Sequence, residues 1–546
     1  MPHSTPALVV IALFLVGAPA VTAAPPAVPG PAASAVTAPH VLPSGQIHIA
    51  RRQPPTWLIG AKPGARTDGI AARHGAEKVS DRGTFVVARG AARRLARALR
   101  TRGLYRFAEP DRRVSHSQAP PGGDDVAATD WRPVIRPPAA LPSLANGPLT
   151  AVIDDAVDTG HPDLTDVSVT RHASIADWHG TAVASLVGGR ANGVGMVGVL
   201  PGAPLLSIGT TFTTGDIVGA IAQAVDAGAR VVNMSFGSPF FSFGIYREIA
   251  YAVSQGVLPV AAAGNDRQSE LPDGTRNPVQ FPAALPHVLS VASMGPSGAS
   301  SSFSTSNGAV DVSAPGEAVL AAVPAGLDPD GTPDGYARVD GTSFAAPIVA
   351  GAAAWLLAAR PQLQAVQAAD LLRDTARNIG APGWDPDSGY GRIDLGRALA
   401  RTAPAVDPGE MNDDIEWVNG RRFTRPDRFL FRKRHRRRRV DASVDLWKDP
   451  ADVDRVQVRA RTRIRLTLTL PRRDDADLVA FTTRARTIER ARGLLGASLR
   501  RAGVTDRVTI GAAQRSRVVY VAVIHGGPQA DFLNATYRLT VTRLRR

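Results

Sequence analysis

The chain has 546 residues, no cysteine and a formal net charge of +15. The lack of cysteine excludes a disulfide framework, and a chain of this length can build hydrophobic cores without one. The charge is unevenly distributed, because residues 401–546 contain 33 Lys and Arg against 17 Asp and Glu, a net charge of +16. The first 400 residues are therefore close to neutral, and any attraction to anionic partners belongs to the C-terminal region.

The N-terminal residues have the pattern of an export signal. Residues 7–16 are apolar but too few to cross a bilayer. Small residues follow up to Ala24, which is typical of a secretory signal peptide over residues 1–24. An uncleaved anchor is the alternative, since His3 rather than Lys or Arg precedes the apolar run. We therefore expect a secreted, extracellular or cell-surface protein with a Pro/Ala-rich spacer over residues 25–53.

Residues 54–114 alternate between strand and helix patterns. Strands are expected at residues 57–60, 78–79, 84–88 and 104–108, and helices at residues 68–74 and 91–100. This β-α-β-β-α-β order predicts a small ferredoxin-like α+β domain. Residues 115–132 include a stretch rich in Pro, Gly and Asp, which predicts a linker.

Two ionisable side chains follow at the ends of regular elements. Residues 149–153 form an apolar strand that ends at Asp154, where a carboxylate emerges at the carboxyl edge of a sheet. His179 opens a helix of small residues. An imidazole held by a carboxylate can take the proton of a hydroxyl group. Alone, each residue could merely end a strand or begin a helix.

A serine and an asparagine complete the candidate site. Ser343 begins an apolar, Ala-rich helix, whose unpaired amides stabilise negative charge beside them. A plain helix cap is the alternative for this serine. Pro347 is expected in the first turn of that helix, where it costs no hydrogen bond. Asn265, at the end of an apolar strand, carries an amide that can donate to a developing oxyanion. Asp154, His179 and Ser343 follow one another in the chain order of subtilisin.

These segments resemble the active-site signatures of the subtilisin family of serine peptidases, and the resemblance covers about residues 133–403. It implies an α/β catalytic domain with a parallel sheet in three layers. It also implies that Asp154 orients the imidazole, His179 is the general base, Ser343 is the nucleophile and Asn265 is the oxyanion donor.

The same resemblance implies a substrate cleft. Ser235-Phe236-Gly237 would pair as an edge strand with an extended substrate. Ala262-Ala263-Gly264 would form one wall of the pocket for the residue before the scissile bond. Gln280 is expected near the floor of that pocket, where the family often has glycine, and would narrow it.

Asp155 and Ala156 depart from the family pattern of Thr or Ser and then Gly. Two adjacent carboxylates repel each other, and one is held protonated if both are buried. An active peptidase is the favoured interpretation, and a catalytically silent peptidase-like binding protein is the alternative.

The chemistry needs no cofactor, but a structural calcium ion is one expectation. Asp163, Asn192 and the loop over residues 190–195 resemble a calcium site of many family members. A Gly-rich surface turn without an ion is the alternative.

The resemblance also suggests how the chain is organised. A domain like residues 54–114 is the inhibitory propeptide of such peptidases, which assists folding and fills the cleft until it is cut off. Residues 115–132 would be the processing region. We expect a monomer that acts on protein or peptide substrates, with its own propeptide as inhibitor.

The C-terminal region is predicted to be all β. Residues 404–440 contain the run 432–439, seven Arg and Lys with one His, and are expected to be an Arg-rich linker. Residues 441–546 contain alternating strand patterns and are expected to form a β-sandwich like those appended to secreted bacterial peptidases. The basic charge would attract an anionic cell-surface polymer, and a solvated linker without a partner is the alternative.

Overall fold

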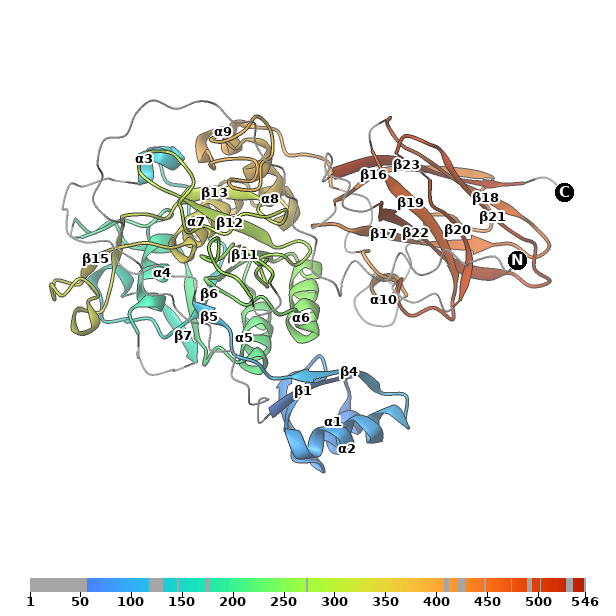
Figure 1. Ribbon diagram of the computed structural model, residues 1–546, viewed down its shortest axis with the longest axis horizontal. Coiled ribbons are helices and arrows are strands. Elements are labelled where there is room, and N and C mark those ends of the chain that lie inside the picture. Colours follow the sequence, from blue (N-terminus) through green and yellow to red (C-terminus); the bar gives the residue numbers. More distant parts are fainter. Residues whose placement is uncertain are drawn as a thin grey trace.

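The structure, a computed structural model, describes residues 56–116, 131–144, 147–165, 167–171, 177–193, 195–271, 274–406, 412–419, 429–445, 448–472, 474–488, 493–500, 502–526 and 534–544. The predicted signal peptide and spacer lie outside these residues, as does most of the predicted processing region. Three units follow one another along the described chain (Figure 1).

The first unit is an antiparallel sheet, in the order β2-β3-β1-β4, that packs against two helices. Its elements are β1 (Thr56–Ala61), α1 (Ala65–Ala72), β2 (Glu77–Ser80), β3 (Thr84–Ala88), α2 (Arg89–Arg100) and β4 (Tyr105–Pro110). Ile59 and Phe85 of the sheet pack against Leu95 and Leu99 of α2. The predicted β-α-β-β-α-β order is therefore confirmed.

The second unit contains a seven-stranded parallel sheet in the order β13-β12-β11-β9-β6-β8-β7. Its strands are β6 (Thr150–Asp154), β7 (Ser168–Arg171), β8 (Leu205–Gly209), β9 (Val231–Met234), β11 (Leu258–Ala262), β12 (Leu289–Met294) and β13 (Val312–Pro315). Its helices are α3 (Arg132–Ile135), α4 (His179–Gly188), α5 (Thr214–Asp226), α6 (Phe243–Ser254), α7 (Thr342–Ala359), α8 (Ala365–Asp374) and α9 (Leu395–Ala400). Two short pairs complete it, namely β5 (Ser115–His116) with β10 (Phe236–Gly237), and β14 (Val319–Ala322) with β15 (Tyr336–Val339).

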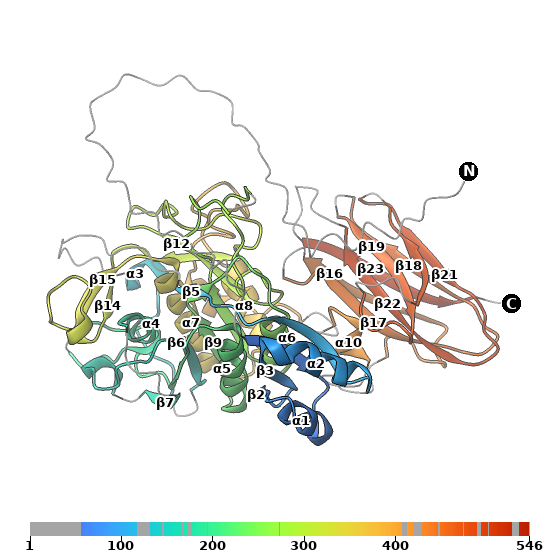
Figure 2. The same ribbon diagram turned by 60° about the horizontal axis from the view of Figure 1, so that its bottom comes forward.

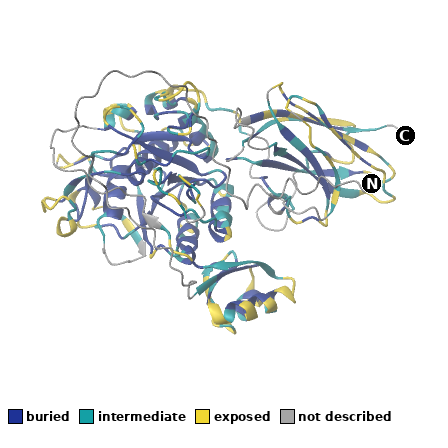
Figure 3. Ribbon diagram, in the orientation of Figure 1, coloured by how far each residue is buried: buried dark blue, intermediate teal, exposed yellow. Residues whose placement is uncertain are grey.

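Helices cover both faces of this sheet and produce three layers. Val152 of β6 belongs to the cluster that includes α4 and α7, whereas Ile153 belongs to the cluster that includes α5 and α6. Figure 3 shows these layers as the most continuous buried region of the molecule. Helix α7 is apolar enough to cross a membrane, but 89% of it is buried inside the protein, as a core helix is. The expected three-layer α/β fold is confirmed.

The third unit is a sandwich of two four-stranded antiparallel sheets, in the orders β16-β23-β18-β21 and β17-β22-β19-β20. Its elements are α10 (Ile415–Val418), β16 (Arg437–Asp445), β17 (Ala451–Val458), β18 (Ile464–Thr469), β19 (Ala476–Thr482), β20 (Leu494–Ser498), β21 (Asp506–Ile510), β22 (Arg517–His525) and β23 (Asn534–Arg543). Leu466, Val521 and Leu539 lie in the core between the sheets. The expected β-sandwich is confirmed.

The expected linker over residues 404–440 is wrong in two places. Ile415 of α10 packs against Phe481 and Tyr520 of the sandwich. Arg437 begins β16, which pairs along its length with β23. The charge of the Arg run suggested a solvated linker, yet a strand at the edge of a sheet can pair its backbone while its charged side chains stay in water.

A buried lysine ties the sandwich to the second unit. Lys448 Nζ donates to the carbonyl oxygens of Ala283 and Val288, both at 2.8 Å, and lies 3.0 Å from Asp311 Oδ2. A buried ammonium is stable only with such partners. The two units are therefore joined by a specific contact.

Candidate active site

Asp154 and His179 meet at the carboxyl edge of the parallel sheet. Asp154 is the last residue of β6, and His179 is the first residue of α4. Asp154 Oδ1 lies 2.7 Å from His179 Nδ1, and both side chains are 0% exposed. Burial alone would lower the pKa of His179, but the charge and hydrogen bond of Asp154 outweigh burial and raise it. The carboxylate therefore fixes the imidazole with its proton on Nδ1, which leaves Nε2 to act as a base.

Ser343 lies in the first turn of α7 and is linked to Ser235 by two hydrogen bonds. Ser343 Oγ donates to the Ser235 carbonyl at 2.9 Å, and Ser235 Oγ donates to the Ser343 carbonyl at 2.7 Å. The prediction for Pro347 is wrong, because this residue lies inside α7 rather than in its first turn. A proline there cannot donate to the carbonyl four residues earlier, which is that of Ser343. The Ser235 hydroxyl donates to the Ser343 carbonyl instead. Pro347 therefore leaves free the carbonyl through which α7 is hydrogen-bonded to Ser235.

Asn265 is hydrogen-bonded to Thr342, the residue before Ser343. Its Oδ1 accepts hydrogen bonds from the Thr342 backbone N–H and the Thr342 hydroxyl, both at 3.0 Å. Because a backbone N–H can only donate, these bonds fix which end of the amide is oxygen. The Nδ2 atom is buried and has no hydrogen-bond partner among the residues that the structure describes. Asn265 Nδ2 is thus a buried N–H donor that is available to bond a further oxygen atom.

Asp155 places a second carboxylate beside the pair. Burial, and then the charge of Asp154, raise the pKa of Asp155 to about 7. The charges of Asp155 and Asp177 in turn contribute to the raised pKa of His179. Asp154 is buried but Asp155 is only half-buried, so the condition that both carboxylates are buried is not met. The raised pKa nevertheless means that Asp155 is mostly protonated below about pH 7.

The segment that follows the first unit lies between β10 and the loop after β8. On one side β5 pairs antiparallel with β10, so that Phe236 lies opposite His116 and Gly237 opposite Ser115. On the other side Val114 N donates to the Phe212 carbonyl at 2.8 Å. Sequence analysis predicted the first of these edges but missed the second. The second edge follows β8 at the same end of the sheet where Asp154 ends β6, which is the signal that could have revealed it.

The residues expected to form the pocket wall lie close to Gln280. Ala262 and Ala263 are buried at the end of β11. A Cβ atom on Gly264 would lie 2.5 Å from Gln280 Cγ, and one on Gly237 would lie 3.2 Å from Gln280 Oε1. Gln280 therefore lies close to both the expected wall and the expected edge strand.

Two carboxylates of the first unit cap helices of the second. Glu109 accepts hydrogen bonds from Ser242 Oγ at 2.7 Å and from Gly244 N at 3.0 Å, at the start of α6. Asp111 accepts one from Gly215 N at 2.7 Å, at the start of α5. Such contacts are worth about 1 kcal/mol each, because carboxylates satisfy the free amides and oppose the helix dipole. Both views of the molecule show the first unit against α5 and α6 (Figure 2).

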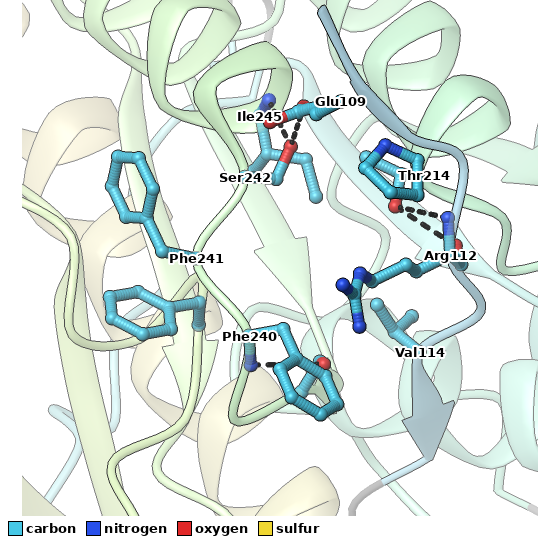
Figure 4. Close-up of a pocket in the computed structure, with 11 residues that line it drawn as sticks. Glu109, Arg112, Val114, Thr214, Phe240, Phe241, Ser242 and Ile245 are labelled. Carbon is cyan, nitrogen blue, oxygen red and sulfur yellow. Dashed lines mark hydrogen bonds between the residues drawn. The ribbon is translucent and has the colours of Figure 1, made fainter. Parts of the chain in front are cut away.

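A cavity of about 100 Å³ lies beside these contacts. Figure 4 shows Arg112 and Val114 on one side of it and Phe240 on another, with Glu109 bonded to Ser242. Neither His179 nor Ser343 lines it. It is a gap in the interface between the first two units, separate from the candidate catalytic residues.

The expected calcium ligands come together without fitting a cation. Asn192 Nδ2 donates to Asp163 Oδ1 at 2.9 Å and to the Pro162 carbonyl at 3.3 Å. Asp163 Oδ2 accepts from Met196 N at 3.4 Å. Calcium needs six to eight oxygen ligands, whereas here an amide nitrogen bridges two of the oxygens. No step of the chemistry below involves a metal.

Comparisons with known proteins agree with this geometry. The model of the subtilase family matches residues 145–391. Subtilisin E of Bacillus subtilis (strain 168) is 34% identical over 242 residues, which are 42% of this chain and 60% of that protein. Subtilisin of Bacillus pumilus is 33% identical over 243 residues, which are 42% of this chain and 84% of that protein.

One solved structure extends the likeness beyond the catalytic unit. The crystal structure of fervidolysin from Fervidobacterium pennivorans, described as a keratinolytic enzyme related to subtilisin, matches with a TM-score of 0.55. At 21% identity it covers 83% of this chain and 84% of its own, and this likeness shows a shared fold. The chain spans only 60% of the length of subtilisin E, and most of the Bacillus pumilus protein. Together with the family match, these identities show that the chain belongs to the subtilase family.

Proposed function

We propose that this protein is a secreted, monomeric serine endopeptidase that is made as a precursor and cuts off its own propeptide. The observation that carries the proposal is the buried 2.7 Å contact between His179 and Asp154. It lies at the start of the helix that bears Ser343, because the His179 ring is 5.4 Å from the ring of Phe344, the next residue. A narrowed pocket suits small or slender side chains before the scissile bond. The basic C-terminal region adds an anionic polymer to its partners.

In the mechanism, Ser343 Oγ attacks the carbonyl carbon of the substrate while His179 Nε2 takes its proton. Asp154 stabilises the imidazolium that forms. Asn265 Nδ2 and the Ser343 amide donate to the oxyanion of the tetrahedral intermediate. His179 then protonates the leaving amine, and a water molecule, activated by the same imidazole, releases the acyl group.

The first unit would act as inhibitor because its tail takes the place of a substrate strand. Backbone pairing with Phe236 and Gly237 supports this role, since it is sequence-independent and suits an extended peptide. The caps at Glu109 and Asp111 would hold the unit in place after cleavage.

Hydrolysis of a chromogenic peptide by the mature protein tests the proposal. We expect turnover, together with labelling of Ser343 by a serine-directed phosphonate. A mature protein that binds peptides but neither cleaves them nor reacts with the phosphonate would instead be the silent binding protein.

Replacing Asn265 with alanine is expected to lower kcat by about 10²–10³-fold with little change in KM, a scale known from subtilisin. The Nδ2 donor acts on the oxyanion, which exists only in the transition state and intermediate. Asn265→Asp is the matched variant, since it keeps an oxygen for Thr342 but loses the donor. Equal activity of Asn265→Asp and the wild type would show that Asn265 only positions the helix.

Replacing Asp155 with asparagine is expected to move the acidic limb of the kcat/KM profile to lower pH. Above about pH 7 Asp155 is ionised, and its charge stabilises the His179 imidazolium. Removal of that charge lowers the pKa of His179, so the neutral base persists in more acidic solution. Asp226→Asn, on the exposed end of α5, should leave the limb in place. A limb that moves to higher pH would contradict this assignment.

The register of the tail suggests where the precursor is cut. A chain that continues past the partner of Phe236 brings its next residue opposite Ser235, whose carbonyl accepts the Ser343 hydroxyl. In the precursor that residue is Ser117, so we expect cleavage of the bond to Gln118. Both residues lie outside those that the structure describes. N-terminal sequencing of the mature protein should therefore start at Gln118, and a start within residues 121–132 would contradict this register.

A further inference from the structure

The sandwich has one sheet face made only of polar side chains. Alternate residues of β18 and β23, such as Leu466 and Leu539, point into the core. The others point outward, and with their neighbours on β16 and β21 they form the Arg/Thr face. Its members are Arg437, Arg439, Asp441 and Ser443 of β16, Thr536, Arg538, Thr540 and Thr542 of β23, Arg465, Thr467 and Thr469 of β18, and Arg507 and Thr509 of β21.

The strand register orders these side chains in rows. One row reads Arg437, Thr542, Arg465 and Thr509 across the four strands, and the next reads Arg439, Thr540, Thr467 and Arg507. Rows are about 7 Å apart along the strands, and neighbours within a row are about 5 Å apart. Arginine and threonine side chains recur from row to row, which suits a partner with a repeating structure.

Short threonines and long arginines give this face its relief. A hollow of about 340 Å³ lies over it, lined by Thr467, Thr469, Thr540 and Thr542 and by Arg437, Arg439, Arg465 and Arg538. Its threonines lie on β18 and β23, with Arg437 and Arg439 on the neighbouring strand β16. Arg465 and Arg538 lie on the same two strands as the threonines. The hollow is thus a shallow trough lined by both hydroxyl and guanidinium groups.

Most of this positive charge is uncompensated. Arg538 is paired with Asp441, with Nε to Oδ1 at 2.6 Å. Within the described part of the chain, no ion pair engages Arg437, Arg439 or Arg465, nor Arg507 at the far edge. Like charges this close destabilise a fold unless salt or a bound anion screens them.

We propose that the Arg/Thr face binds a linear phosphodiester polymer of the polyol phosphate type, which lies in the trough along β18 and β23. Guanidinium groups bind phosphate oxygens through paired N–H donors, and threonine hydroxyls donate to the same oxygens. The face has no aromatic side chain on which a nucleic acid base would stack and no apolar side chain to enter a bilayer. The Arg/Thr face would be the surface that binds the anionic polymer proposed for the C-terminal region. Its binding would not depend on peptidase activity.

Binding of full-length Ser343→Ala protein to delipidated poly(glycerol phosphate) tests the proposal, because this variant keeps the chain intact. The face variant is Arg437→Thr with Arg439→Thr and Arg465→Thr. The control variant removes the same charge at exposed arginines outside the face, namely Arg434→Thr with Arg459→Thr and Arg515→Thr. Threonine suits a strand, so the fold should persist, and a thermal unfolding scan checks this.

The face variant should bind at least tenfold more weakly than the control variant, with a salt slope smaller by about two units. In the protein with the unmodified face, addition of the polymer should slow the exchange of backbone amide hydrogens in β18 and β23. Equal weakening in both triple variants would overturn the proposal in favour of diffuse attraction. Tighter binding to single-stranded DNA or to phosphatidylglycerol vesicles would overturn the choice of polymer.

Discussion

Replacing Ser343 with alanine is expected to lower peptide hydrolysis by about 10⁶-fold, the scale known for the nucleophile of subtilisin. The variant keeps the helix, the oxyanion donors and the substrate strands, but no atom can form the acyl bond. What remains is the rate that binding and the oxyanion donors provide. Steady-state hydrolysis of a chromogenic peptide measures the loss, and denatured precursor on a gel shows whether the chain stays whole.

Ser254→Ala provides the matched control for this prediction. Ser254 ends α6, and among the residues that the structure describes its hydroxyl bonds to the Tyr251 carbonyl of that helix and to Gln255. We expect this variant to process itself and to hydrolyse peptide at the wild-type rate. Activity of Ser343→Ala within a factor of ten of the wild type would mean that another group is the nucleophile.

Replacing Asp154 with asparagine is expected to lower kcat by about 10⁴-fold. An asparagine can direct its amide N–H at His179 Nδ1, which moves the imidazole proton to Nε2 and removes the base. The imidazolium also loses the charge that raises its pKa. Kinetics of the mature variant, obtained by cleavage of its precursor in trans by wild-type protein, measure the effect.

Asp155→Asn is the matched comparison for Asp154, since the same chemical change is made one residue away. It should retain most of the activity at neutral pH and change only the pH profile. Combining Asp154→Asn with Ser343→Ala should cost little beyond Ser343→Ala alone, because the two residues act as a unit. Equal effects of the two aspartate variants would contradict the separate roles given to them.

The residues of the candidate site could be picked out from the sequence because each lies at the end of a strongly patterned element. Asp154 ends an apolar strand, His179 begins a helix of small residues, and Ser343 begins an apolar one. In a parallel sheet these ends meet at one edge. The fold was predictable for the same reason, since long periodic segments dominate it.

Contacts between distant segments could not be predicted in this way. The bond from Ser235 to the Ser343 carbonyl depends on a proline inside α7, and the helix pattern alone gave no reason to place Pro347 there. The sequence pattern did not predict the strand that begins at Arg437, because a run of charged residues is typical of a solvated linker. This strand forms through pairing with β23, which lies far along the chain. Asp163 and Asn192 lie together as expected. Whether they bind a cation or each other depends on which way the Asn192 amide points, and the sequence does not determine that direction.

The most direct test of self-processing is the intact mass of the precursor beside that of its Ser343→Ala variant. We expect the wild type to lose the segment up to Ser117 and the variant to keep it. A wild type that stays uncut, and that fails to react with a serine-directed phosphonate even after an outside protease removes the propeptide, would contradict a working catalytic triad.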